Sequence, residues 1–251
     1  MPDAAGGRPL RVCALYPELM NIYADRGNLI VLERRCEWRG IGFELTASGL
    51  GEPLDPDGHD VYYIGGGQDR DQRLCAEDLL ARKADALREA AAREAVILGV
   101  CGGYQLLGNA YTLDDERIEG VGLLDLETVR EDGPRLIGNV AIEPSGLPGA
   151  PRATVLAGFE NHGGRTYLGA EQAPLGRVLR GHGNDGCSGL EGAITGATIG
   201  TYLHGPLLPK NVWFADWLIA RALGSSRGAL AALDDTLENQ THDAAMRAAG
   251  V

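Results

Sequence analysis

The first 110 residues alternate between short apolar segments and longer segments of helical character, and this alternation limits the folds open to the chain. The apolar segments predict buried strands, and the Ala-, Arg- and Leu-rich segments between them predict helices. Strands are predicted at 10–16, 41–47, 60–64 and 95–100. Helices are predicted at 22–39, at 70–93 with Asp69 or Asp71 as N-cap, and after residue 101. This order is typical of an α/β protein built on a parallel sheet.

The sequence changes in character after residue 115. Its segments become shorter and richer in β-branched residues, with glycine or proline between them, which predicts antiparallel strands that extend the same core. One more helix is predicted at 209–223, with Pro209 in its first turn. Because no repeat or internal boundary is visible, we expect one domain at 8–224 followed by an Ala-rich acidic tail at 225–251.

Bulk composition excludes several classes of function. The net charge of -12 argues against nucleic acid as the main partner, because that partner requires a basic surface. The N-terminus lacks the apolar stretch of a signal peptide, and no apolar run approaches the ~18 residues of a transmembrane helix. We therefore expect a soluble, cytoplasmic protein without a transmembrane segment.

Cysteine and lysine are informative through what they lack. The five cysteines are scattered and contain no CxxC pair, so we expect neither a metal site nor a disulfide framework. The two lysines, Lys83 and Lys210, do not follow glycines, so the chain has no Walker A phosphate loop. If the protein takes part in an ATP-driven reaction, we expect another chain to hold the ATP.

The strongest local signal is the pentapeptide at 99–103, Gly-Val-Cys-Gly-Gly, directly after the predicted strand. A nucleophile between small residues at a strand-to-helix turn is typical of a nucleophile elbow. The following helix would point its N-terminus at the sulfur of Cys101 and favour the thiolate. The N–H of Gly102 would then be placed to stabilise an oxyanion. The alternative is a buried structural cysteine in a glycine-rich turn.

A cysteine nucleophile requires an imidazole as acid and base, and His204 is the best candidate among the five histidines. It follows the apolar segment IGTYL and precedes Gly205, which places it at the end of a strand, at the edge where an elbow lies. The alternative is a surface or capping histidine.

Three consecutive glycines, 65–67, follow another predicted strand. Glycines at a strand end let the backbone approach a ligand closely, and one N–H could be a second oxyanion donor. The alternative is a permissive turn.

Together these pieces resemble the class I (triad-type) glutamine amidotransferases, in the cobyric-acid-synthase-like branch. The resemblance covers about residues 10–223 and rests on LYPELMNIYADRGN, IGGGQDRDQ, GVCGGYQLLG, GFENHGGRTYLG and GTYLHGPLLPKN, in that order. It implies a flavodoxin- or Rossmann-like three-layer sandwich with a central, mostly parallel sheet and antiparallel strands in the C-terminal half. Within the branch, the motifs are most similar to glutaminase subunits that form a heterodimer with a Mur-ligase-like synthetase and amidate D-glutamate of the peptidoglycan stem peptide.

The resemblance implies roles for nine residues. Cys101 would attack the side-chain amide of L-glutamine and His204 would move the protons, while the N–H groups of Gly67 and Gly102 would form the oxyanion hole. The substrate-binding residues implied are Gln105, Arg135, Asn161, His162 and Gly163. An arginine fork suits a carboxylate, although a surface ion pair is an equal alternative for Arg135. No cofactor is implied in this chain, and ATP and Mg are expected in the partner subunit.

One position departs from the wider class. Most triad enzymes carry a glutamate two residues after the histidine, where this chain has Pro206. The acid could come from elsewhere in the chain, the partner could supply it, or the enzyme could work as a dyad. We hypothesise a carboxylate from the partner, in which case the isolated subunit would hydrolyse glutamine slowly.

Other functions stay open at this point. Within the family the acceptor could be of the cobyrinate type. Outside it, the elbow would also suit an unrelated α/β cysteine hydrolase acting on an ester or lactone. A non-catalytic subunit that kept the fold is a third alternative, disfavoured by the presence of both Cys101 and His204.

Overall fold

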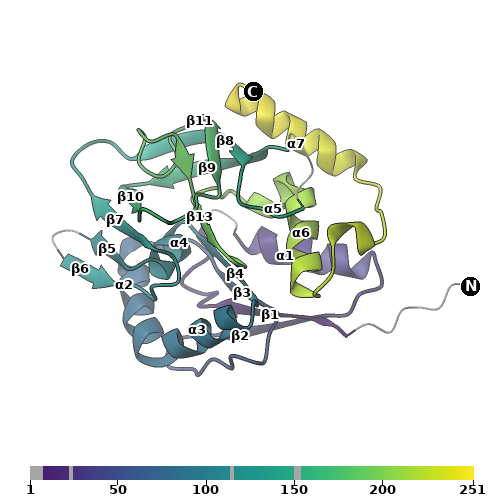
Figure 1. Ribbon diagram of the computed structural model, residues 1–251, viewed down its shortest axis with the longest axis horizontal. Coiled ribbons are helices and arrows are strands. Elements are labelled where there is room, and N and C mark those ends of the chain that lie inside the picture. Colours follow the sequence, from purple (N-terminus) through teal and green to yellow (C-terminus); the bar gives the residue numbers. More distant parts are fainter. Residues whose placement is uncertain (1–7, 23–24, 114–115, 150–153) are drawn as a thin grey trace, which may run out of the picture.

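A six-stranded sheet forms the centre of the protein in the computed structural model, which describes residues 8–22, 25–113, 116–149 and 154–251 (Figure 1). Its strands are β1 (Leu10–Leu15), β2 (Phe43–Ser48), β3 (Val61–Ile64), β4 (Val96–Val100), β13 (Ala193–Thr195) and β14 (Thr198–Thr201). They follow the order β13-β14-β4-β3-β1-β2, and all neighbours are parallel except β13 and β14. The strands predicted in the first 110 residues are thus confirmed.

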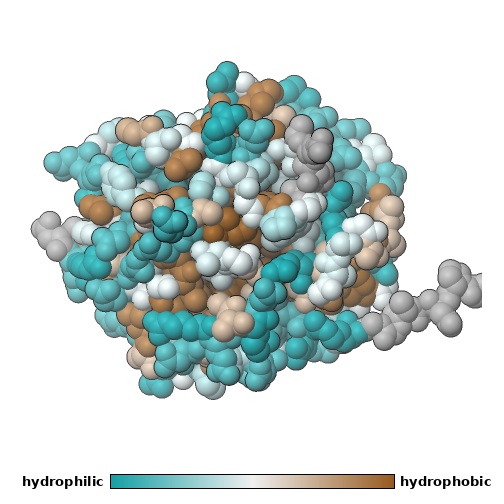
Figure 2. All heavy atoms as spheres, in the orientation of Figure 1, coloured by the Kyte–Doolittle hydropathy of each residue, from teal (hydrophilic) through white to brown (hydrophobic). Residues whose placement is uncertain are grey.

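Helices cover both faces of this sheet (Figure 1). Those of the first half are α1 (Arg26–Glu37), α2 (Asp69–Asp78), the π-helical segment η2 (Leu79–Lys83), α3 (Ala84–Ala92) and α4 (Gly102–Leu107). Two more are α5 (Leu207–Lys210) and α6 (Val212–Ala222), which pack with α1. Every residue of β3 and β4 is buried, as expected for strands covered on both faces. Figure 2 shows a mostly hydrophilic face, with hydrophobic residues visible towards its centre.

The strand-rich second half does not simply extend the central sheet, which corrects the prediction. Only β13 and β14 join that sheet, and the remaining strands form two separate four-stranded sheets. One, β10-β7-β5-β6, contains β5 (Ala110–Leu113), β6 (Glu116–Glu119), β7 (Leu126–Arg130) and β10 (Gly164–Leu168). The other, β12-β11-β8-β9, contains β8 (Leu136–Pro144), β9 (Leu156–His162), β11 (Gly176–Arg180) and β12 (Leu190–Glu191).

The helices differ from their predicted boundaries in three places. Helix α1 is shorter than 22–39, and α2 begins after Gln68 rather than after an aspartate cap. The helix predicted at 70–93 is interrupted by the π-helical segment, where Lys83 is buried and its ammonium contacts Asp78 and the carbonyl of Gly49. The helix predicted at 209–223 is two helices, α5 and α6. Asn211 separates them because its side chain binds the backbone of Ala157 and the carbonyl of Leu207.

The last 27 residues contain a 3-10 turn, η3 (Arg227–Ala229), and helix α7 (Thr236–Ala249). Helix α7 packs against β8, β9 and α5, although none of its residues is buried. Just before it, Asp235 forms an ion pair with the buried Arg35 of α1 at 2.8 Å. Among the described residues, no helix combines the length and apolar character required to span a bilayer.

Candidate active site

Cys101 lies at the junction of β4 and α4 with its backbone in the left-handed region (φ 53°, ψ -108°). Such a conformation costs a residue with a side chain about 1–3 kcal/mol and is held only by its surroundings. The Cys101 N–H donates to the carbonyl of Thr201 at 2.8 Å. A Cβ on Gly99 would lie 2.8 Å from the backbone of Gly103, and one on Gly103 would lie 2.3 Å from the carbonyl oxygen of Ile64. The flanking residues must therefore be glycines.

The loop of glycines 65–67, which we call the oxyanion loop, packs directly against this elbow. The N–H of Gly103 donates to the carbonyl of Gly65 at 3.1 Å. A Cβ on Gly102 would lie 3.2 Å from the nitrogen of Gly67. The two N–H groups expected to stabilise an oxyanion thus belong to backbone segments in close contact.

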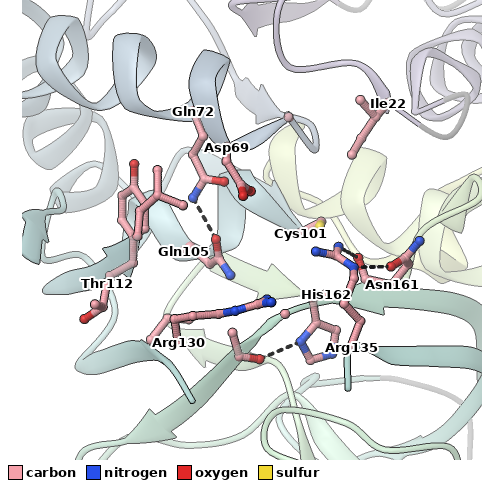
Figure 3. A pocket seen from close by; sticks show the side chains of 16 residues that line it. Ile22, Asp69, Gln72, Cys101, Gln105, Thr112, Arg130, Arg135, Asn161 and His162 are labelled. Carbon is pink, nitrogen blue, oxygen red and sulfur yellow. Dashed lines mark hydrogen bonds between the residues drawn. The ribbon is translucent and has the colours of Figure 1, made fainter. Parts of the chain in front are cut away.

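A pocket of about 140 Å³ opens beside the Cys101 sulfur (Figure 3). Seven of the nine predicted site residues line it: Gly67, Cys101, Gln105, Arg135, Asn161, His162 and Gly163. Gly102 lies under the elbow, next to the pocket. The other lining residues, which the sequence did not single out, are Ile22, Asp69, Gln72, Tyr111, Thr112, Leu113, Thr128, Arg130 and Gly164.

His204 is fully buried and does not line this pocket. It follows β14, the strand that pairs with β4 and supplies Thr201 as the backbone partner of Cys101. Its own backbone pairs with Phe159 of β9 through two hydrogen bonds, of 2.9 and 3.0 Å. The histidine is therefore held at the same edge of the sheet as the elbow, between the central sheet and β9.

Burial controls the protonation of both groups. It raises the pKa of Cys101 to about 12, and the nearby Asp25 raises it further. The expectation that the helix N-terminus favours the thiolate is therefore wrong for the isolated chain. The hydrogen bond from Gly102 and the charge of Arg135 lower that pKa, but less than desolvation raises it. Burial, aided by His162 and Lys210, lowers the pKa of His204 to about 4, so both groups are neutral near pH 7.

Two arginines meet at one corner of the pocket. Arg135 donates from Nε to the side-chain oxygen of Asn161 and from Nη2 to its carbonyl, both at 2.9 Å. Arg130 extends across the pocket (Figure 3), and its Nη1 lies 1.4 Å from where a Cβ on residue 163 would be. Gly163 is therefore required so that Arg130 can reach over it. Sequence patterns gave no sign of Arg130, because its approach depends on the pairing of β7 with β10.

A chain of side-chain hydrogen bonds forms another wall. Gln72 donates to Gln105 at 2.7 Å, and Gln105 donates to the hydroxyl of Tyr202 at 3.0 Å. The ring of Tyr202 stacks on His162 at 3.6 Å, with 4° between the planes. Both amides are thus fixed in orientation before any substrate arrives.

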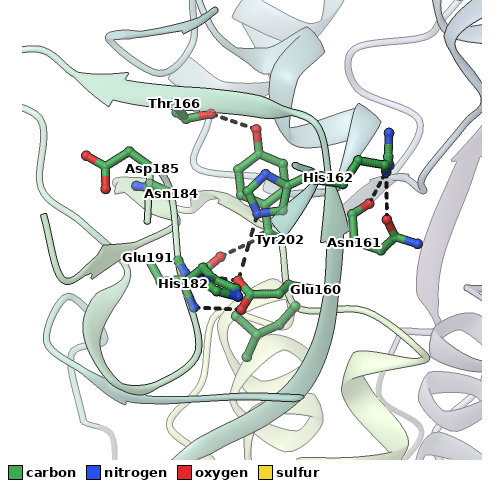
Figure 4. A network of polar contacts seen from close by, with 12 residues as sticks. Glu160, Asn161, His162, Thr166, His182, Asn184, Asp185, Glu191 and Tyr202 are labelled. Atoms are coloured by element: carbon green, nitrogen blue, oxygen red, sulfur yellow. Dashed lines mark hydrogen bonds and ion pairs between the residues drawn. The ribbon is translucent and has the colours of Figure 1, made fainter. Parts of the chain in front are cut away.

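Two buried glutamates lie behind this wall (Figure 4). Glu160 accepts hydrogen bonds from the backbone of His182 and Gly183 and lies 3.8 Å from Nε2 of His162. Glu191 accepts from the N–H of Tyr202 at 2.6 Å, and burial raises its pKa to about 8. Neither glutamate could be identified from the sequence, because the loops that surround them come from distant segments.

Comparison with known proteins yields a consistent result. Residues 11–212 match the model of the CobB/CobQ-like glutamine amidotransferase domain. The chain is 35% identical to the lipid II isoglutaminyl synthase (glutamine-hydrolyzing) subunit GatD of Streptococcus pneumoniae, over 92% of this chain and 88% of that protein. It is 39% identical to the subunit of the same name from Staphylococcus aureus, over 81% and 80%.

Solved structures agree on the fold. PurLQS from Thermotoga maritima is similar with a TM-score of 0.56 at 18% identity, over 95% of this chain and 99% of that chain. A glutamine amidotransferase from the same organism has a TM-score of 0.52 at 17% identity, over 95% and 90%. The predicted α/β fold with a mostly parallel central sheet is thereby confirmed.

Proposed function

Because the chain belongs to the CobB/CobQ-like glutamine amidotransferase family, we propose that it is the glutaminase subunit of a lipid II isoglutaminyl synthase. The enzyme hydrolyses L-glutamine and passes the ammonia to a Mur-ligase-like partner, which amidates D-glutamate of the stem peptide. The similarity to two subunits with this name, over most of both chains, supports the acceptor. The partner binds ATP and Mg, and the heterodimer works in the cytoplasm.

The observation that carries the chemistry is the strained Cys101 at the mouth of a small polar pocket. Its sulfur attacks the side-chain amide carbon of glutamine while its proton passes to His204. The proton then moves to the leaving nitrogen, the C–N bond breaks, and ammonia and a thioester form. Water hydrolyses the thioester to glutamate, again with His204 as base. The N–H groups of Gly67 and Gly102 stabilise the oxyanion in both halves.

The substrate is held by the corner opposite the elbow. Arg135, fixed by Asn161, presents its remaining N–H groups to the carboxylate of glutamine, with Gly163 alongside. Gln105 and His162 contact the rest of the molecule. Because these side chains already bond to one another, little conformational entropy is lost when glutamine binds.

A carboxylate from the partner completes the site. Burial and three cationic or ionisable neighbours, His162, Lys210 and Arg135, all lower the pKa of His204. A carboxylate brought close to this imidazole would raise the pKa again and let it take the thiol proton. We therefore expect slow hydrolysis by the isolated chain and faster hydrolysis in the complex.

The test is co-purification of the partner, followed by assays of ammonia release and of ATP-dependent amidation of lipid II. We expect Cys101→Ser to abolish ammonia release and glutamine-dependent amidation, while externally added ammonia still supports amidation. Full glutaminase activity of the chain alone, unchanged by the partner, would contradict the shared site. Amidation of a cobyrinate acceptor instead of lipid II, or hydrolysis of esters without preference for glutamine, would contradict the proposed function.

A further inference from the structure

The sequence motif LYPELMNIYADRGN has no role in the chemistry described so far, yet its last residues lie beside the site. Asp25 and Asn28, both fully buried, stand at the start of α1. Residues 23 and 24 of the motif lie outside the described part. The contacts of 25–28 run to two loops that are distant in sequence.

The first is the oxyanion loop. The N–H of Gly66 donates to Oδ2 of Asp25 at 2.8 Å, and the carbonyl of Gly66 accepts from the N–H of Ile22 at 3.1 Å. Gly66 is thus held through both its backbone groups. The next N–H along the chain is that of Gly67, which faces the elbow.

The second is the loop after His204, residues 205–208, which we call the histidine loop. The side-chain oxygen of Asn28 accepts from the N–H of Leu208 at 2.8 Å. A Cβ on Gly27 would lie 2.7 Å from Cγ of Pro206, so α1 and Pro206 are in direct contact. Position 206 is the one where most related enzymes carry an acid.

A third residue joins the two ends of the segment. The amide of Asn28 donates to the hydroxyl of Tyr63 at 2.9 Å, and that hydroxyl donates to the carbonyl of Asp25 at 3.3 Å. Tyr63 lies in β3, directly before the oxyanion loop.

Burial of Asp25 is costly, which argues that it is more than a space-filling residue. Its Oδ1 is buried without a hydrogen-bond partner among the described residues, and burial raises its pKa to about 7. A carboxyl group in such a position costs free energy that a neutral residue would not. The remaining oxygen, however, is the acceptor for Gly66.

We propose that residues 25–28 act as a positioning element that fixes the oxyanion loop and the histidine loop relative to each other. Asp25 holds the backbone that presents the Gly67 N–H. Gly27 and Asn28 hold the turn that carries His204. This inference rests on the proposed function, because the loops matter only if Cys101 performs acyl transfer.

The test compares Asp25→Ala, Gly27→Ala and Asn28→Ala with Arg26→Ala, an exposed neighbour in the same segment. Glutaminase activity is measured with the full chain, alone and with its co-purified partner. Loss of one oxyanion donor lowers kcat by about 10²–10³ in other enzymes. We expect Asp25→Ala to lower kcat by about 100-fold and change KM less than threefold, while Arg26→Ala has the activity of the unchanged chain.

Gly27→Ala separates positioning from stability. Alanine favours a helix over glycine by about 1 kcal/mol, so this variant should fold with an undiminished Tm. Its new methyl group would nevertheless displace Pro206 and the histidine loop. We expect kcat to fall at least tenfold, which a purely structural role of the segment would not produce. This variant decides the matter if Asp25→Ala does not fold.

Asp25→Asn gives the rescue. The asparagine oxygen can still accept from Gly66, so we expect at least ten times the kcat of Asp25→Ala. Hydrogen exchange at the Gly66 amide provides a readout independent of catalysis, and protection should be lost in Asp25→Ala and kept in Arg26→Ala.

Two results would overturn the inference: folded Asp25→Ala and Gly27→Ala with kcat within threefold of the unchanged chain, or a rise in KM that accounts for the whole loss. If the unchanged chain releases no ammonia from glutamine with its partner present, the proposed function fails instead. The hydrogen-exchange result would still show whether Asp25 holds Gly66.

Discussion

At the scale of single residues, Cys101 combines two properties that oppose each other. Its left-handed backbone exposes the sulfur to the pocket, whereas its burial keeps the thiol protonated. Reactivity in the isolated chain is limited by the second property. The approach of a base with a raised pKa would relieve it without moving the elbow.

We predict slow alkylation of Cys101 by iodoacetamide at pH 7. A thiol whose pKa is about 12 is almost entirely protonated there, and only the thiolate reacts. The rate should rise about tenfold per pH unit between pH 7 and 9, because the thiolate fraction does so well below the pKa. Site-resolved mass spectrometry measures it, with the exposed Cys187 as internal reference. A plateau of the Cys101 rate below pH 9 would contradict the raised pKa.

Arg130 provides a second prediction at this scale. Its guanidinium lies over Gly163 and extends into the pocket, where a carboxylate of the substrate would be bound. Replacement by glutamine removes the charge, and a hydrogen bond to a charged group is worth about 1.5–3 kcal/mol. We expect Arg130→Gln to raise the KM for glutamine at least tenfold. The control is Arg177→Gln, an exposed arginine of β11 that does not line the pocket. Equal KM values would exclude Arg130 from substrate binding.

At the scale of elements, the histidine loop depends on how two helices meet. Local periodicity predicts one helix at 209–223, and the chain forms two because Asn211 turns its side chain into the protein. Its amide satisfies the backbone of Ala157 in β9 and ends α5. Local patterns locate helical sequence here, but a long-range contact decides where it breaks.

We predict that Asn211→Ala lowers the free energy of unfolding by about 3 kcal/mol, since it leaves several buried backbone groups without partners. Urea denaturation measures the change. Asn239→Ala, on the exposed surface of α7, serves as a matched control and should change stability by less than about 0.5 kcal/mol. A loss of similar size in both variants would show that Asn211 does not join α5 to β9.

The π-helical turn and the separate sheets show the same limit of local sequence. Each strand of the second half is visible as a β-branched segment between glycines or prolines. Which strands pair is set by burial against other elements, so the expected extension of the central sheet was wrong. The first half was easier, because strand–helix alternation leaves few arrangements other than a parallel sheet.

At the scale of the whole molecule, the C-terminal segment covers α1 and the edge of the second half (Figure 1). Helix α7 buries none of its residues, but the stretch before it supplies Asp235 and the carbonyl of Ala231 to the arginines of α1. The segment therefore contributes to stability mainly through residues 231–235.

Two truncations test this division. Removal of residues 236–251 should lower the free energy of unfolding by less than about 1 kcal/mol, since only exposed contacts are lost. Removal of 225–251 should cost about 2 kcal/mol more, because the buried Arg35 then keeps Asp216 but loses Asp235. Urea denaturation of both variants measures the difference. Equal stabilities would contradict a role for Asp235.

The sequence by itself determined the elbow, the strands of the central sheet and the identity of Cys101 and His204. These features are local, because only glycine fits around a left-handed cysteine and only apolar residues fill a strand covered on both faces. Tertiary structure decided the protonation of the two groups, the reach of Arg130 over Gly163 and the bonds of Asp25 and Asn28. Desolvation and contact between segments more than 40 residues apart depend on how the whole chain packs, and no short pattern of residues encodes them.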